Sequence, residues 1–140
     1  MGNIFRAIKK RLSKRQHPQN SNGGLEVVED SPYYPFSWRS NDDGEYVVVL
    51  YAGDEYRHDI LESHGMPDTG YIWEALAEKY INEEFPEARE IIELDPESDM
   101  FCAYSEDENI LRRFVEGFKA LCEDDEKMKA FLVNIDKADL

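Results

Sequence analysis

The segment EYVVVLYAG, residues 45–53, constrains the fold of this chain more than any other feature. It places valine, leucine and tyrosine between the turn sequence NDDG and a glycine, which is typical of a buried β-strand. Residues 71–84 carry a different period, because their apolar side chains recur every fourth residue and so predict an amphipathic helix. A chain with both signals must combine sheet and helix in one core.

Shorter patterns complete the predicted order of elements. The segment 54–65 favours a helical turn, and Ser105 with Glu108 fits the capping box of a following helix. The other predicted elements are a strand at 25–30, a hairpin of strands 90–94 and 100–104 joined by DPESD, and helices near 107–122 and 125–136. This order predicts an α+β fold, a small antiparallel sheet with helices packed on one face.

Charge divides the chain into two unequal parts. Six of the 16 cationic residues lie in residues 1–25, which contain no acid, and the other ten share residues 26–140 with all 31 acidic residues. We therefore expect a basic tail with a flexible linker over 1–24 and a single acidic domain over 25–140. Such a domain repels phosphate groups and attracts basic proteins, so we expect no nucleic-acid partner.

The tail combines an apolar stripe with a basic face, and residues 3–13 predict a short amphipathic helix. Two interpretations stay open: the tail folds back on the acidic domain, or it makes weak contact with a membrane. The candidate membrane-contact residues are Ile4, Phe5, Ile8, Lys9, Lys10 and Leu12. The sequence has no apolar run long enough to span a membrane and no secretory signal, so we expect a cytoplasmic protein. Its two cysteines, Cys102 and Cys122, are expected to be buried and reduced.

Carboxylates gather around the predicted hairpin and form the candidate binding site: Glu93, Asp95, Glu97, Asp99, Glu106 and Asp107. They are interpreted as a solvated hairpin tip or as a surface that binds a basic protein. A third hypothesis is a hydrolase that uses the carboxylates of residues 93–99, with Asp95 and Glu97 as the residues to test.

Signatures of catalysis and metal binding are missing from the sequence. DPESD lacks the glycine and the terminal glutamate of a calcium loop, and His58 and His64 do not have zinc-ligand spacing. No phosphate-binding or nucleophile motif occurs. We therefore expect no catalytic residue, no metal and no cofactor.

Several short motifs occur in a common order along the chain. They are PFSW (35–38), Gly70-Tyr71 followed by Trp73, Leu94-Asp95-Pro96-Glu97, Met100-Phe101 with Ala103-Tyr104, and an acidic turn before the last helix. Over roughly residues 33–136 the chain resembles the immunity protein 51 family (Imm51) of bacterial polymorphic toxin systems. The resemblance implies a non-enzymatic protein that binds and neutralises a cognate toxin, and it transfers no catalytic residues.

The acidic domain adds an expectation about this partner. A basic toxin would be attracted to the domain and its substrate-binding surface occluded, because complementary charge speeds association and favours the correct partner. The alternative function is a membrane-tethered adaptor, which would use the basic N-terminal helix as its anchor and the domain as a protein-binding head.

Overall fold

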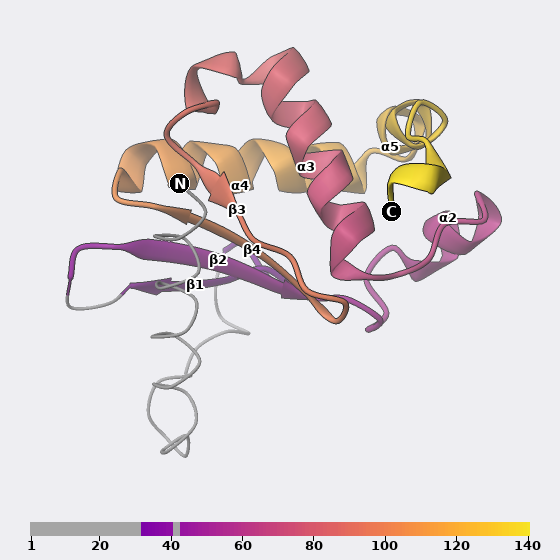
Figure 1. Cartoon of the computed structure of the whole chain (residues 1–140), viewed down its shortest axis with the longest axis horizontal. Coiled ribbons are helices and arrows are strands. Elements are labelled where there is room, and N and C mark those ends of the chain that lie inside the picture. Colours follow the sequence, from indigo (N-terminus) through magenta and orange to yellow (C-terminus); the bar gives the residue numbers. More distant parts are fainter. Residues whose placement is uncertain (1–31, 41–42) are drawn as a thin grey trace.

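A computed structural model describes residues 32–40 and 43–140 of the chain. Within these residues the strands form one antiparallel sheet in the order β1-β2-β4-β3, with the helices on one side of it (Figure 1). The strands are β1 (Ser37–Ser40), β2 (Tyr46–Tyr51), β3 (Glu93–Leu94) and β4 (Met100–Ser105). The predicted α+β fold class is confirmed.

The helical elements lie where apolar periodicity or turn signals place them. They are α2 (His58–Ser63), α3 (Gly70–Glu84), the short 3-10 turn η3 (Pro86–Ala88), α4 (Glu108–Glu123), α5 (Asp125–Leu132) and η4 (Lys137–Asp139). The segment 54–65 does contain a helix. The predicted strand at 25–30, the tail over 1–24 and its candidate membrane-contact residues lie outside the described residues.

Pairing between β2 and β4 sorts their side chains onto two faces. Because Val48 is opposite Ala103 and alternate residues share a face, Val48, Leu50, Phe101 and Ala103 face the helices. Here the ring of Phe118 from α4 contacts five other aromatic rings, those of Phe36, Trp73, Tyr80, Phe101 and Phe114. This cluster ties α3 and α4 to the sheet and forms the centre of the core.

The opposite side of the sheet, which we call the second face, carries Val47, Val49, Cys102 and Tyr104. An antiparallel sheet often leaves one side in water. These four side chains are nevertheless only 0–1 % exposed. Both sides of the central strand pair are therefore buried.

The first hairpin strand is shorter than predicted. Residues 90–92 do not pair with β4, because the backbone amides of Ile91 and Ile92 both donate to the carbonyl oxygen of Ala88, each at 3.0 Å. Pro86 starts η3 just before them and turns the chain away from an extended path. Only two residues are left to form β3, and the predicted hairpin connection to β4 is retained.

The predicted capping box at Ser105 and Glu108 is wrong. Ser105 is still paired with Tyr46 at the end of β4, so it is not available as the residue that starts a helix. Asp107 is the N-cap of α4 instead, and its side chain accepts a hydrogen bond from the Ile110 amide at 3.1 Å. The helix consequently begins at Glu108.

The last α-helix ends earlier than predicted, at Leu132 rather than near residue 136. The amides of Asn134 and Ile135 bond to carbonyl oxygens three residues back, at Phe131 and Leu132, which closes the helix in tight turns. Ile135 still packs against the core beyond the helix.

Candidate functional site

Strand β4 divides the six candidate carboxylates into two groups. Glu97 and Asp99 lie in the turn before this strand, and Glu106 and Asp107 follow directly after it. Six residues of extended chain, the whole of β4, separate the two groups by about 20 Å. The structure therefore does not bring the predicted site together in one place.

The two remaining carboxylates belong to β3 and the residue after it. Glu93 pairs with Tyr104 near the end of β4, which places it beside the group that follows the strand. Asp95 lies between the groups, and its amide donates to the carbonyl oxygen of Cys102 at 3.0 Å.

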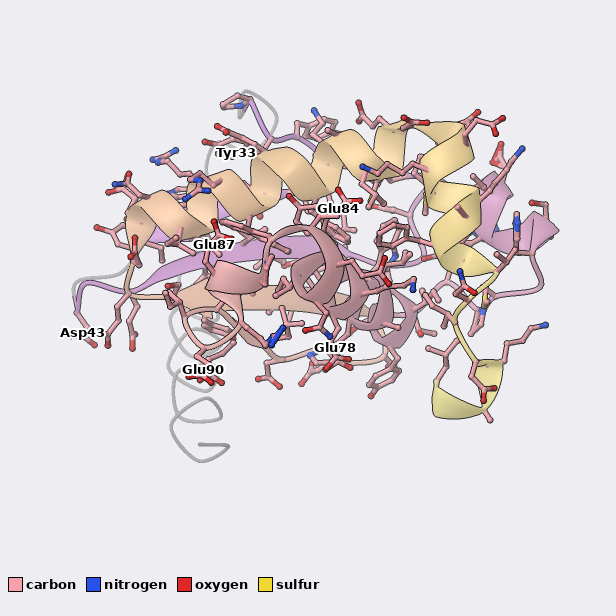
Figure 2. The ribbon with its side chains drawn as sticks, turned by 90° about the horizontal axis from the view of Figure 1, so that it is seen from above. Tyr33, Asp43, Glu78, Glu84, Glu87 and Glu90 are labelled. Atoms are coloured by element: carbon pink, nitrogen blue, oxygen red, sulfur yellow. The ribbon has the colours of Figure 1, made fainter. Side chains whose placement is uncertain are left out.

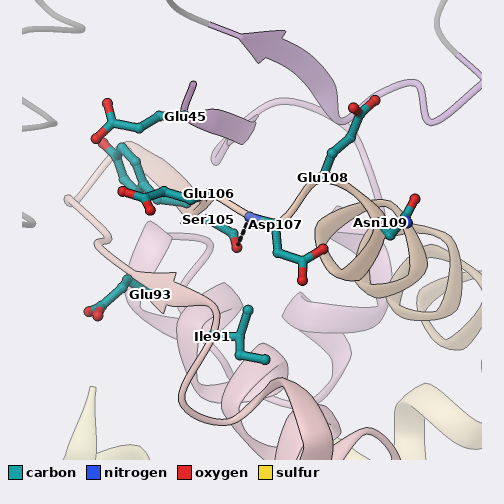
Figure 3. A pocket seen from close by; sticks show the side chains of 9 residues that line it. Glu45, Ile91, Glu93, Ser105, Glu106, Asp107, Glu108 and Asn109 are labelled. Atoms are coloured by element: carbon teal, nitrogen blue, oxygen red, sulfur yellow. Dashed lines mark hydrogen bonds between the residues drawn. The ribbon is translucent and has the colours of Figure 1, made fainter. Parts of the chain in front are cut away.

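A cavity of about 600 Å³ opens where β4 runs into α4 (Figure 3). Three of the candidate residues line it, Glu93, Glu106 and Asp107. Two further carboxylates join them, Glu45 and Glu108, and Figure 3 shows all five carboxylates around the end of the sheet. We call these five residues the acidic cavity.

Sequence reasoning missed Glu45 and Glu108 for different reasons. Glu45 precedes β2, and it enters the cavity because Tyr46 pairs with Ser105 and so brings Glu45 next to the residue after β4. This long-range register cannot be read from local pattern. Glu108 was assigned to a capping box, whereas its carboxylate bonds to Arg112 one turn along α4, at 2.9 Å.

Backbone geometry fixes the acidic cavity at the start of α4. The hydroxyl oxygen of Ser105 accepts a hydrogen bond from the Asp107 amide at 2.9 Å, drawn in Figure 3, and the Asp107 carboxylate caps the helix. The positive end of the helix dipole favours acids here. The cavity also contains an apolar contact, because Ile91 lines it and is 40 % exposed.

Charge is compensated unequally across the surface. On the helical side, Glu84 is paired with Lys127 at 2.8 Å and Glu87 with Arg113 at 3.3 Å (Figure 2). In the acidic cavity, the exposed Glu93 and Glu106 form no ion pair with any residue of 32–40 or 43–140. These two carboxylates of the cavity therefore keep their negative charge, whereas Glu108 shares its charge with Arg112.

The turn before β4 is packed against the start of α3. The amide of Gly70 donates to the carbonyl oxygen of Ser98 at 3.1 Å, and a Cβ atom on Gly70 would collide with the carbonyl oxygens of Glu97 and Met100. Two motifs that lie far apart in sequence, around Gly70 and around residues 94–101, therefore meet here. The close backbone contact explains why glycine occupies position 70, since a larger residue would not fit against the turn before β4.

Negative charges are crowded near the turn before β4, and their repulsion makes a further carboxylate harder to ionise. Partial burial on α3 raises the pKa of the Glu74 carboxyl, and the negative charges of Glu78 and Asp95 raise it further. The carboxylates of Glu97 and Asp99 nevertheless point away from the core, since both residues are exposed. This end of β4 carries acids on a tightly packed backbone.

Chemical groups elsewhere are held in structural roles. Cys102 and Cys122 are both buried, and burial raises the pKa of the Cys122 thiol, so this thiol stays protonated. His58 bonds to Asp68 at 2.9 Å. Among the described residues, no three His, Cys, Asp or Glu side chains are placed to hold a metal ion.

No helix in the described part of the chain has the length and apolar character needed to cross a membrane. Comparison with curated proteins and with solved structures gives no match. The family model for immunity protein 51 matches residues 36–137, which covers every strand and helix described above except the last residues of η4. The chain belongs to the immunity protein 51 family.

Proposed function

We propose that this chain is a non-enzymatic immunity protein that binds a cognate basic toxin in the cytoplasm and blocks the toxin by occupying its active surface. Membership of the immunity protein 51 family supports the immunity role and implies a toxin as partner. The proposal adds the surface, the charge of the partner and the mechanism of occlusion.

The observation that carries the choice of surface is the acidic cavity. Five carboxylates from three separate segments converge on it, and two of them, Glu93 and Glu106, are exposed without a cationic partner among the described residues. A concave acidic surface with an exposed isoleucine matches a basic protrusion that carries an apolar side chain. Negative charge would steer such a partner toward the cavity before contact.

Occlusion by charge also explains why no catalytic group is required. A toxin that acts on a polyanion needs a cationic surface for its substrate, and an acidic domain can fill that surface. The residues of the cavity then act by position and charge alone. We place Glu93, Glu106 and Asp107 at the centre of contact and Glu97 and Asp99 outside it.

The experiment starts with affinity capture of the tagged full chain from its own organism, with identification of the retained protein by mass spectrometry. The captured protein is then expressed in a test host with and without this chain. We expect toxicity that the chain relieves. Association of the purified pair should slow as salt rises, because screening weakens steering between opposite charges.

Two matched double variants locate the surface. Glu93→Lys with Glu106→Lys reverses charge at the acidic cavity, and Glu55→Lys with Glu62→Lys makes the same change near α2, at the other end of the molecule (Figure 1). We expect the cavity variant to slow association by on the order of tenfold or more and the control to have a small effect. Equal effects would show that net charge alone matters and would refute the cavity as the binding surface.

A further inference from the structure

We propose that the second face of the sheet is covered by the chain's own N-terminal segment, with the apolar stripe of residues 3–13 packed on it. The inference concerns the fold of the free protein and does not depend on the proposed function. Its starting point is the burial of Val47, Val49, Cys102 and Tyr104, which lie on the side of the sheet opposite α3 and α4 (Figure 1).

The described residues supply little apolar cover for this face. Among the hydrophobic side chains of 32–40 and 43–140, only the half-buried Met100 packs against these four residues. Two valines, a cysteine and a tyrosine cannot reach 0–1 % exposure without a layer above them. The helices cannot provide that layer, since they pack on the other side of the sheet.

The N-terminal segment has side chains suited to this position. Ile4, Ile8 and Leu12 recur every fourth residue with Phe5 beside them, which gives one helix face four large apolar groups. The rest of the segment before Pro32 has a smaller apolar set, Leu25, Val27 and Val28, in the predicted strand at 25–30. A short helix laid across a sheet buries such a stripe, and burial of each large side chain contributes about 2 kcal/mol.

The point of attachment makes this contact easy to reach. The described chain begins at Pro32, just before β1 at the edge of the same sheet. About 20 residues separate Leu12 from Pro32, and a chain of that length spans roughly 25 Å on average, comparable to the width of a small sheet. The tail is therefore always present at high local concentration beside the second face.

Charge favours the tail over other occupants. Residues 1–25 hold six cations and no acid. Glu93 lies opposite Tyr104 in the pairing of β3 with β4, so its carboxylate borders the second face on that edge. A second copy of this chain, with a formal net charge of −15, would place like charges together, whereas the tail brings opposite charge to an acidic border.

The two cysteines provide a direct test, because Cys102 lies on the second face and Cys122 lies in the core beneath the helices. The full chain is treated with N-ethylmaleimide, and labelling at each cysteine is followed by peptide mass spectrometry. We expect slow labelling of both in the unaltered chain. Ile4→Gln with Ile8→Gln should speed labelling of Cys102 by about tenfold or more and leave Cys122 protected.

A matched control uses Ala7→Gln with Ser13→Gln. These positions lie off the apolar stripe, and the variant introduces the same two residues at unchanged net charge. We expect labelling as in the unaltered chain. Rapid labelling of Cys102 in the unaltered chain, or slow labelling in the Ile4→Gln, Ile8→Gln variant, would overturn the proposal.

A second measurement remains decisive if the stripe variant unfolds, which faster labelling of Cys122 would reveal. Ile4→Cys, Ile8→Cys and Leu12→Cys are made singly, and each full chain is oxidised under mild conditions. We expect at least one of them to form a disulfide with Cys102 within the same chain, and Ala7→Cys to form none. Disulfides between chains would show that a second copy covers the face, and absence of any bond to Cys102 would refute the proposal.

Discussion

The two ends of β4 carry acids at similar density, but their surroundings differ. Before the strand, Glu97 and Asp99 sit on a turn whose backbone is locked against Gly70 of α3. After the strand, Glu106 and Asp107 open into a cavity that gathers acids from two other segments. The density of acids in a sequence therefore does not identify a binding surface, whereas the packing of the backbone beneath them separates a structural turn from an accessible site.

Among substitutions near the two ends of β4, a change at Gly70 should cause the largest loss of stability. In Gly70→Ala the new Cβ atom would overlap two carbonyl oxygens, which cannot move unless the turn before β4 moves with them. We expect the free energy of unfolding to fall by about 3 kcal/mol, as for severe overpacking. Urea unfolding measures this change.

Gly117→Ala in α4 is the matched control, because it adds the same methyl group. There the Cβ atom would meet the hydroxyl of Tyr80, a side chain of the core whose ring must move to make room, whereas at Gly70 the obstacle is backbone. Alanine also favours the helix interior over glycine by about 1 kcal/mol, which offsets part of the cost. A loss in Gly70→Ala no larger than in Gly117→Ala would contradict a structural role for the turn.

Substitution of Asp107 tests the end of β4 that leads into α4, and its effect on stability should be smaller. Asp107→Ala removes the side chain that caps α4, so we expect a loss of about 1 kcal/mol in the free energy of unfolding. Asp107→Asn keeps a capping oxygen and removes the charge, so its stability should stay within a few tenths of a kcal/mol. Thermal and urea unfolding of the two variants measure the difference.

The same pair separates capping from partner binding. Both substitutions remove one negative charge from the acidic cavity, so both should slow association with a basic toxin. If the asparagine variant were as unstable as the alanine variant, the charge near the helix dipole rather than the hydrogen bond would stabilise α4.

Local sequence patterns were sufficient to predict most helices and strands, but not the residues of the acidic cavity. The strand at 46–51 and the helix at 70–84 follow from apolar periods that the chain carries within each segment. The start of α4 was misplaced because Ser105 fits a capping pattern, yet its pairing with Tyr46 keeps it in the sheet. A contact between distant segments thus overrode a local signal.

The acidic cavity depends on such contacts throughout. Glu45 lies about 60 positions before Glu106 in the sequence, and only the register of β2 with β4 brings them together. The contact of Gly70 with the turn before β4 is also long-range. A single sequence contains the acids and the glycine, but it does not state which of them meet.

Glu74→Gln tests the crowding of acids near the turn before β4, and it should change the free energy of unfolding only modestly. Burial raises the pKa of its carboxyl above the ordinary value, so the ionised form at neutral pH disfavours the folded state. We expect Glu74→Gln to raise the free energy of unfolding at pH 7 by about 0.5 kcal/mol or less, since the side chain is only partly buried and solvent screens its charge.

The pH dependence gives the sign of this effect. The folded protein binds the proton of Glu74 more tightly than the unfolded chain, so the cost of the carboxylate disappears as pH falls through the folded-state pKa. The gain in stability from Glu74→Gln should therefore vanish at low pH, where the side chain at position 74 is neutral in both the variant and the unaltered protein. An advantage that persists unchanged at low pH would show that its origin is not electrostatic. Glu90→Gln, at an exposed position after η3, is the control, because the charge of Glu90 does not act on Glu74.

The smallest predicted effect is at His58, which joins α2 to the segment that leads into Gly70. The hydrogen bond to Asp68 raises the pKa of His58 above its ordinary value of 6.5, and the same Asp68 side chain accepts from the Trp73 indole at 3.3 Å. NMR titration should show this raised pKa in the unaltered protein. In Asp68→Asn it should return toward 6.5, because the amide oxygen can keep the bond to Trp73 but carries no charge.

Folding therefore favours protonated His58, so its contribution to stability is fully present below the unfolded-state pKa and is lost as pH rises through the folded-state pKa. Urea unfolding of the unaltered protein and of His58→Gln at about pH 5.5 and about pH 8.5 measures this contribution. The difference between the two proteins should be larger at the acidic value. Because His58 lies on the surface, we expect added salt to reduce that difference. A difference that grows with pH would show that neutral His58, rather than the ion pair with Asp68, holds α2 at the start of α3.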